Sequence, residues 1–344
     1  MKIAVAMSGG VDSSVAAALL KKAGHEITGL TMQLADGSRS EADAAVVARC
    51  LDIPHRVIDL REVFADRVID PFCREYRAGR TPNPCIWCNA CIKFGALWEE
   101  AVKLGAEALA TGHYARVEKD GGAYFLKKGT DATKDQSYFL YRLSQEQLAR
   151  TVFPVGGLSK PEVRKMAADL GLPSVSRPES NEICFIPDND HAAFLESYMR
   201  EPSPPGPILD ASGRTLGRHR GIASYTIGQR KGLGIAAPEP LYVTAIRPED
   251  NAVIAGARQD TYGAELVAAG LHWISIAPPR RPVNLRARIR YRHAAADAVV
   301  TPLENDAFSV KFNEPQMAIT PGQAVVFYQG DKVVGGGTIM KRGS

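Results

Sequence analysis

The chain has 344 residues, of which 45% are hydrophobic and 23% charged, and its net charge is +4. This length and composition predict a soluble globular protein of two or three domains. No apolar run is long enough to span a bilayer, and glycines at 9 and 10 interrupt the first one. These features exclude a membrane span and a secretory leader, and we expect a cytoplasmic protein.

Residues 8–14, Ser-Gly-Gly-Val-Asp-Ser-Ser, join a predicted buried strand at 3–7 to a predicted helix at 13–23. The glycines allow the backbone to turn, so that several N–H groups and the positive end of the helix dipole can meet a phosphate or pyrophosphate. The Walker sequence GxxxxGK[ST] is absent. The alternative is an ordinary strand–helix turn with a polar cap. We favour the nucleotide site.

Strands and helices alternate up to residue 112, which predicts an α/β fold with a doubly wound parallel sheet. Ligands of such sheets bind outside the carboxyl ends of the strands. Met32 ends one predicted strand and Gly112 follows another, so both would flank adenine and ribose. Taken alone, however, each is better explained as a core methionine or a turn glycine. The predicted strands are 3–7, 26–32, 55–60 and 108–111, and the helices are 13–23, 40–51 and 61–70, the last limited by Pro71.

The segment 81–94, Thr-Pro-Asn-Pro-Cys-Ile-Trp-Cys-Asn-Ala-Cys-Ile-Lys-Phe, predicts a rigid turn followed by a helix from about 89 to 103. Cys88 would then lie near the N-terminus of the helix. The helix dipole and Lys93 are expected to lower the pKa of its thiol and make it a nucleophile. Cys184 has apolar neighbours, and taken alone it is better explained as a small buried residue than as a reactive one.

Ser159 and Glu162 form a capping-box pattern that predicts a helix ending at Gly171. A proline-rich run at 201–207 then separates this part from a chain rich in short β-like runs. We expect domains at 1–199 (nucleotide-binding), 200–265 (small, β-rich) and 266–344 (β-barrel).

The part of the chain from 200 to 344 carries 18 Lys and Arg residues against 12 Asp and Glu residues. This excess would suit an RNA backbone, but a normal solvated surface is the simpler explanation of charge alone. Alternation predicts that Arg286, Arg288, Arg290 and Arg292 share one face of a strand, beside Tyr291 and His293. Such a row would suit phosphate contacts and base stacking, or again a solvated barrel face.

Taken together, these motifs resemble the bacterial tRNA-specific 2-thiouridylases, a family of the N-type ATP pyrophosphatase superfamily. The resemblance covers nearly the whole chain. It is carried by SGGVDSS at 8–14, TPNP..CN..IKF at 81–94, TGHYAR at 111–116, KDQSYFL at 134–140, ICFIP at 183–187, YTIGQRKGLGI at 225–235 and RYR at 290–292.

The resemblance implies an adenylating N-terminal domain, a small central domain and a C-terminal β-barrel that helps to hold tRNA. It implies ATP with Mg²⁺, a persulfide sulfur donor or relay protein, and tRNA of the Lys, Glu and Gln types modified at the wobble uridine. No membrane partner is implied.

The motifs carry the family's functional residues onto this chain. Cys88 would be the nucleophile and Cys184 the persulfide carrier, and the two would form a disulfide after sulfur transfer. The ATP site would be formed by Met7, Ser8, Gly9, Gly10, Val11, Asp12, Ser13, Ser14, Met32 and Gly112. The target base would meet Asn83, Pro84 and Cys85, and other tRNA contacts would come from His113, Lys134, Asp135, Gln136, Arg290, Tyr291 and Gln323.

Two departures from the family pattern stand out. The family usually has Asp where this chain has Cys85, so Cys85, Cys88 and Cys184 could instead ligate a [4Fe-4S] cluster that carries the sulfur, or a zinc ion. The segment after Met32, at 33–40, is short and lacks a Trp often found there, which weakens the adenine contacts expected in it. Cys91 receives no role, and Cys50 and Cys73 are expected to be structural.

Two other classes of function compete with 2-thiolation. One is a different enzyme with a pyrophosphate loop, such as an amidotransferase-like ligase or another tRNA thiolase, although a plain ligase needs no redox thiols. The other is a non-catalytic RNA-binding module that uses the basic barrel, although the intact loop at 8–14 argues against it.

Overall fold

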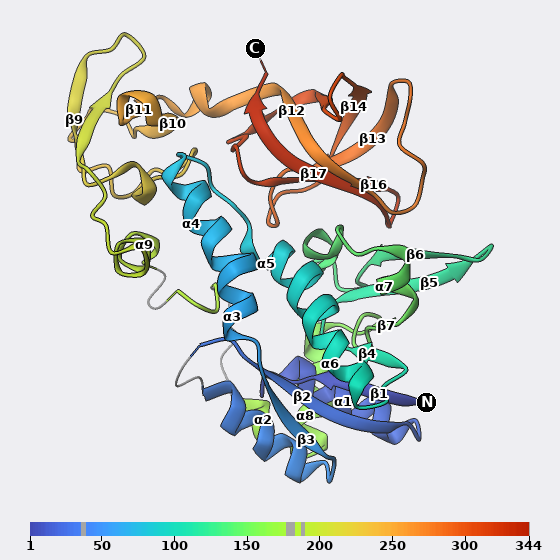
Figure 1. Cartoon of the computed structure of the whole chain (residues 1–344). Helices are drawn as coiled ribbons and strands as arrows, with labels where there is room; N and C mark the ends of the chain where they lie inside the picture. Colours follow the sequence, from blue (N-terminus) through green and yellow to red (C-terminus); the bar gives the residue numbers. More distant parts are fainter. Residues whose placement is uncertain (36–38, 177–182, 187–189, 344) are drawn as a thin grey trace.

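The computed structural model describes residues 1–35, 39–176, 183–186 and 190–343. It contains a parallel sheet with helices, a small mixed sheet and a C-terminal antiparallel barrel (Figure 1). This arrangement confirms the expected α/β fold followed by two β-rich parts. Within these residues, no helix has the length and apolar character needed to cross a membrane.

The N-terminal sheet has five parallel strands in the order β3-β2-β1-β4-β7. Successive side chains along a strand point to opposite faces of the sheet, and both faces are covered, as in a doubly wound sheet. Ile3 and Val5 pack towards α1 and α2, whereas Ala4 packs against the helices of residues 61–103. The strands are β1 (Lys2–Ala6), β2 (Glu26–Gln33), β3 (His55–Asp59), β4 (Ala108–Ala110) and β7 (Thr151–Val152).

Two long helical runs cover the second face of this sheet. The first continues to Arg77 rather than ending at Pro71, so the predicted end was wrong. A π-helical segment just before Pro71 widens the turn where proline cannot donate a hydrogen bond, which lets the helix continue. The runs are α3 (Arg61–Phe64), η1 (Ala65–Ile69) and α4 (Asp70–Arg77), then α5 (Pro84–Trp87), η2 (Cys88–Ala96) and α6 (Leu97–Lys103).

Two of the remaining helices of the N-terminal part, α7 and α8, begin at serine capping boxes. Ser159 accepts a hydrogen bond from the Glu162 N–H, and the Glu162 carboxylate accepts one from the Ser159 N–H, so the predicted capping box is confirmed. The helices are α1 (Val11–Lys22), α2 (Arg39–Cys50), α7 (Gln145–Ala149) and α8 (Lys160–Asp169).

The central sheet is mixed and has the order β10-β11-β8-β9. Its small core is formed by Ile208, Tyr225, Val243 and Val253. It comprises β8 (Gly206–Leu209), β9 (Thr215–His219), β10 (Tyr242–Arg247) and β11 (Ala252–Gly256), and α9 (His191–Met199) precedes it.

Six antiparallel strands form the C-terminal barrel, which closes because β12 pairs with both β15 and β17. A hairpin of the N-terminal part, β5 (Ala115–Asp120) and β6 (Ala123–Lys128), extends the barrel sheet through the pairing of Lys127 with Lys332. The expected domain limits at 199 and 265 therefore stay predictions. The barrel strands are β12 (Tyr262–Trp273), β13 (Val283–Arg288), β14 (Ala296–Pro302), β15 (Phe308–Met317), β16 (Ala324–Gln329) and β17 (Lys332–Arg342).

The predicted row of four arginines on one strand face is wrong. β13 ends at Arg288, and the chain turns after the buried Ile289, where the His293 N–H bonds to the Arg290 carbonyl. Arg290 and Arg292 therefore lie beyond the strand, and the alternation that would align them with Arg286 is lost.

Candidate active site

The loop at 8–14 leaves β1 and enters α1 as the sequence predicts. Gly9 has a φ of +72°, a conformation that favours glycine, and Gly10 is the N-cap of α1. The hydroxyls of Ser13 and Ser14 both donate to the Gly10 carbonyl, at 3.1 and 2.8 Å, and fix the turn from inside. The first N–H groups of α1 have no intrahelical acceptor, so they can bind a phosphate.

The loop also carries a partly buried ion pair. The Lys160 ammonium at the start of α8 lies 2.7 and 2.8 Å from the two carboxylate oxygens of Asp12. The Tyr114 hydroxyl donates to the same carboxylate at 2.7 Å. Sequence reasoning missed Lys160 and Tyr114 as site residues, because nothing in a helix cap or in a strand end indicates a partner more than a hundred residues away.

The carboxyl end of β4 lies against the loop. A Cβ on Gly112 would come within 2.6 Å of the Asp12 carbonyl carbon and the Ser13 nitrogen, so only glycine fits there. Met7 is buried and Met32 is half-buried against the core. Met7 can reach a ligand only through its backbone, and its carbonyl already accepts the Thr31 hydroxyl.

The cysteine helix begins earlier than expected, at Pro84 with Asn83 as N-cap, because proline is well suited to the first turn of a helix. Cys88 starts the π-helical segment η2 and is buried, whereas Cys85 is exposed. Such π-helical segments often occur at functional sites.

The expected lowering of the Cys88 pKa is wrong for this conformation. Burial raises the pKa of the Cys88 thiol to about 12. Cys85 is exposed at its surface, yet desolvation by the surrounding protein still raises the pKa of its thiol to about 11. The positive charge of Lys93 acts in the expected direction on both, but the loss of solvation outweighs it.

Cys184 lies near the two cysteines of the helix although it is about a hundred residues away in sequence. Its neighbour Phe185 packs edge-on against Phe64 and Phe72, with ring centroids 5.5 and 5.3 Å apart. The Cys184 charge raises the pKa of both Cys85 and Cys88, so these sulfurs are within electrostatic range of one another. Cys184 itself is exposed, yet desolvation still raises the pKa of its thiol. Of the motif at 183–187, Pro187 lies outside the described residues.

Lys93 connects the cysteines with the end of β4. Its charge lowers the pKa of Cys88 and of Cys184, and it also lowers that of His113, which follows Gly112. Lys93 therefore acts electrostatically on the thiols and on the strand end that meets the loop.

The part of the chain that the structure describes contains no group of three His, Cys, Asp or Glu residues arranged to hold a metal ion. Cys85, Cys88 and Cys184 all belong to that part, so this conformation does not present them as cluster ligands. Cys91 is half-buried and Cys50 exposed. Cys73 is buried, and its thiol pKa is raised to about 11.

Several residues predicted to contact tRNA form contacts within the protein in this structure, and their role in binding tRNA stays a prediction. His113 is buried, with Nδ1 2.6 Å from the Thr111 hydroxyl, and burial holds its pKa well below the usual value. Asp135 is 4% exposed and forms an ion pair with Arg288 of β13 at 3.1 Å. The Gln136 amide oxygen accepts the Tyr114 N–H at 3.0 Å, and Lys134 is half-buried.

The barrel residues predicted to contact tRNA also form contacts within the protein. Arg290 is half-buried and donates to the Ile227 carbonyl and to the Thr320 hydroxyl. Gln323 donates to the Thr81 carbonyl at 2.9 Å, just before Asn83 and Pro84. The ring of Tyr291 lies 4.4 Å from that of Phe139 and is half-buried.

Three family models match the chain. They are the tRNA methyl transferase HUP domain over residues 1–188, the tRNA methyl transferase PRC-barrel domain over 192–257, and the aminomethyltransferase beta-barrel domain over 264–339. Together they cover the parallel sheet, the small mixed sheet and the barrel.

Curated relatives match over nearly the full length. The tRNA-specific 2-thiouridylase MnmA of Heliobacterium modesticaldum is 51% identical over 98% of this chain and 92% of its own. The enzyme of the same name from Syntrophotalea carbinolica is 51% identical over 98% of both chains. Solved structures are more distant: a 4-thiouridine synthetase–RNA complex with bound ATP has 19% identity and a TM-score of 0.36, covering 58% of this chain and 50% of its own. A likeness of that size carries no weight for function.

Proposed function

Since the chain belongs to the family of tRNA-specific 2-thiouridylases, we propose that it converts the wobble uridine of tRNA to 2-thiouridine and consumes ATP. The observation that carries the proposal is the geometry of the loop at 8–14, where Gly9 and the first N–H groups of α1 form an anion site against Gly112. Phe185, next to Cys184, packs against the same hydrophobic core as the buried Cys88, so the two cysteine segments lie together.

The first step activates the base. The C2 carbonyl oxygen of uridine attacks the α-phosphorus of ATP, and the bond from that phosphorus to the bridging oxygen breaks to release pyrophosphate. Gly9, Gly10 and the first N–H groups of α1 hold the departing pyrophosphate. Mg²⁺, when bound, would neutralise phosphate charge, and Asp12 is the carboxylate of the loop that would hold it in place of the Lys160 ammonium. The product carries AMP, a good leaving group, on C2.

The second step delivers sulfur. Cys184 carries a persulfide, and the Cys88 thiolate attacks its inner sulfur. The S–S bond breaks, the terminal sulfur leaves as hydrosulfide, and a Cys88–Cys184 disulfide remains. Hydrosulfide adds to C2 and AMP departs. The persulfide sulfur is thus reduced by two electrons while two cysteines are oxidised, and an external thiol must then reduce the disulfide.

An alternative keeps the same reaction but carries sulfur on a [4Fe-4S] cluster bound by Cys85, Cys88 and Cys184. The replacement of the usual Asp by Cys85 favours it, but the described cysteines do not form a ligand set in this conformation. We therefore place the persulfide relay first. Iron and acid-labile sulfide in stoichiometric amounts after anaerobic purification would reverse this order.

The partners follow from the same proposal. The substrate is tRNA of the Lys, Glu and Gln types, and a persulfide donor or relay protein charges Cys184. These partners place the reaction in the cytoplasm.

The decisive experiment replaces each thiol in turn. We expect Cys88→Ala and Cys184→Ala to abolish 2-thiouridine, measured by mass spectrometry of nucleosides from tRNA incubated with enzyme, ATP and a persulfide donor. Both variants should still release pyrophosphate when tRNA is present. The matched control is Cys91→Ala, three residues along the same helical run, which should retain thiolation.

Other outcomes would decide against the proposal. Thiolation by either variant would rule out a persulfide relay through Cys88 and Cys184. Binding of tRNA without any tRNA-dependent pyrophosphate release by the unaltered protein would favour a non-catalytic RNA-binding module.

A further inference from the structure

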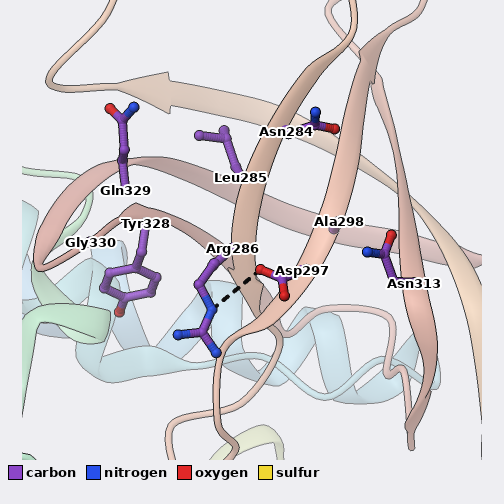
Figure 2. Close-up of a pocket in the computed structure, with 9 residues that line it drawn as sticks. All are labelled: Asn284, Leu285, Arg286, Asp297, Ala298, Asn313, Tyr328, Gln329 and Gly330. Carbon is purple, nitrogen blue, oxygen red and sulfur yellow. Dashed lines mark ion pairs between the residues drawn. The ribbon is translucent and has the colours of Figure 1, made fainter.

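The wall of the barrel carries a pocket of about 350 Å³, with a mixed polar and apolar lining, outside the site described above. It opens over β13, β14, β15 and β16 (Figure 2). Side chains that can form hydrogen bonds line much of it, among them Asn284, Arg286, Asp297, Asn313, Tyr328 and Gln329.

A lysine from the N-terminal part reaches the edge of this pocket. The Lys128 ammonium, at the end of β6, lies 4.4 Å from the centre of the Tyr328 ring and 3.4 Å from the Gly330 carbonyl oxygen. Tyr328 and Gly330 both line the pocket. Arg286 is the register partner of Tyr328, and its guanidinium extends to the same side as the tyrosine ring (Figure 2). Lys128 and Arg286 thus approach Tyr328 from two different parts of the chain.

The charges around Tyr328 are unevenly compensated. Arg288 has the buried carboxylate of Asp135 at 3.1 Å. Arg286 has the exposed carboxylate of Asp297 at 3.6 Å, and its guanidinium also donates to the Ala295 carbonyl. Lys128 has no carboxylate within 4.0 Å among residues 1–35, 39–176, 183–186 and 190–343. It is half-buried, and burial lowers its pKa. The Arg286 and Arg288 guanidinium groups act in the same direction, and the more distant carboxylates of Asp135 and Asp331 oppose them only in part. A cation that lies close to other positive charges is stabilised when an anion binds beside it.

We propose that Lys128 and Arg286 together bind one phosphodiester group of the substrate RNA at this pocket. Arginine offers a planar fork to two phosphate oxygens and lysine a point charge to a third. The amides of Asn284 and Gln329 lie in the same pocket and can bind ribose hydroxyls or base edges next to the phosphate. The proposal rests on the proposed function, because that function supplies an RNA as substrate.

The neighbouring lysine provides a matched control. Lys127 precedes Lys128 on β6, and alternation sends its side chain to the other face of the hairpin. There it already pairs with Glu118 at 2.9 Å and Asp331 at 3.1 Å. Its charge is compensated within the protein, so it should release few counterions from RNA.

The experiment measures the affinity for unmodified tRNA transcript as a function of salt concentration. For Lys128→Ala combined with Arg286→Ala, we expect weaker binding and a slope of log K against log salt about one unit shallower than for the unaltered protein. Lys127→Ala should leave the slope unchanged. Lys128→Arg keeps the positive charge, so it should keep a slope close to that of the unaltered protein. At saturating tRNA, the double variant should retain the kcat for thiolation and show a raised KM.

Three results would overturn the site. These are an unchanged slope in a folded double variant, an equal loss for Lys127→Ala, or binding of inorganic phosphate that depends on Lys128 while tRNA affinity does not. The proposed function fails separately: a protein that never thiolates tRNA but shows the expected change of slope would retain the phosphate site and lose the reaction.

Discussion

Cys88 combines a buried position with a nearby ammonium group, and these act on its thiol in opposite directions. Burial prevails and raises its pKa to about 12. Near neutral pH this thiol is therefore almost entirely protonated, and it is a poor nucleophile in this conformation. The proposed relay then requires that bound substrate, or a movement of the segment at 183–186, brings Cys88 to its reactive form.

This state can be tested by alkylation. With iodoacetamide at pH 7.5 and no ligand, we expect the exposed Cys184 to be modified faster than Cys88, as followed by peptide mass spectrometry. Below its pKa, a thiol gains thiolate about tenfold for each unit of pH. The rate at Cys88 should therefore keep rising through pH 10, and a plateau near pH 8 would contradict the raised pKa.

At the scale of elements, a turn of the barrel holds the segment that leads into the cysteine helix. The Thr81 N–H donates to the Pro321 carbonyl at 2.9 Å, and Gln323 binds the Thr81 carbonyl. Gly322, between them, has a φ of +90°, and a Cβ there would lie 2.9 Å from the Thr81 nitrogen. The position of Cys85 and Cys88 therefore depends on a contact with the barrel.

We expect Gly322→Ala to lower the melting temperature and to reduce thiolation more than pyrophosphate release, because it displaces the start of the cysteine helix rather than the loop at 8–14. Gly213→Ala is the matched control. Gly213 has a φ of +89° but open space around it, so it shares the backbone strain, about 1–2 kcal/mol, without the clash. Equal effects of both changes on thiolation would show that the contact with Thr81 is unimportant.

Features set by neighbours in sequence could be predicted at this scale, and features set by distant contacts could not. The capping box of Ser159 and Glu162 and the glycine turn at 9–10 are local, and both were found. The strand end at Arg288 depends on packing of the barrel, and the π-helical segment at Cys88 depends on its tertiary surroundings. No pattern of residue types indicates either. The resemblance identified the cysteines, but it could not indicate that burial would raise their pKa.

At the scale of the whole molecule, a buried ion pair joins the N-terminal part to the barrel. Asp135 accepts the N–H groups of Gly129 and Ser137 as well as the Arg288 guanidinium, and the side chain of Arg288 is only 13% exposed. Such a pair adds little net stability when it is complete, but the loss of one partner leaves a buried charge without compensation. The sequence could indicate neither this pair nor Lys160, because both join segments far apart in the chain.

We expect Asp135→Asn to destabilise the protein by about 3 kcal/mol, seen as a lower melting temperature and faster proteolysis between the N-terminal part and the barrel. The control is Asp297→Asn, which removes the exposed partner of the neighbouring Arg286 and should cost less than about 1 kcal/mol. A melting temperature for Asp135→Asn equal to that of the control would mean that the pair does not join the two parts.

The hairpin β5–β6 belongs to the N-terminal part in sequence but lies at the edge of the barrel sheet, where the Lys128 N–H bonds to the Asp331 carbonyl. A shortened protein that lacks the barrel would leave this edge of β6 without its neighbour and uncover Leu126, which is fully buried in the intact chain. Open strand edges beside apolar side chains recruit other chains. Production of the nucleotide-binding part alone should therefore yield insoluble aggregates unless β6 is altered at the same time.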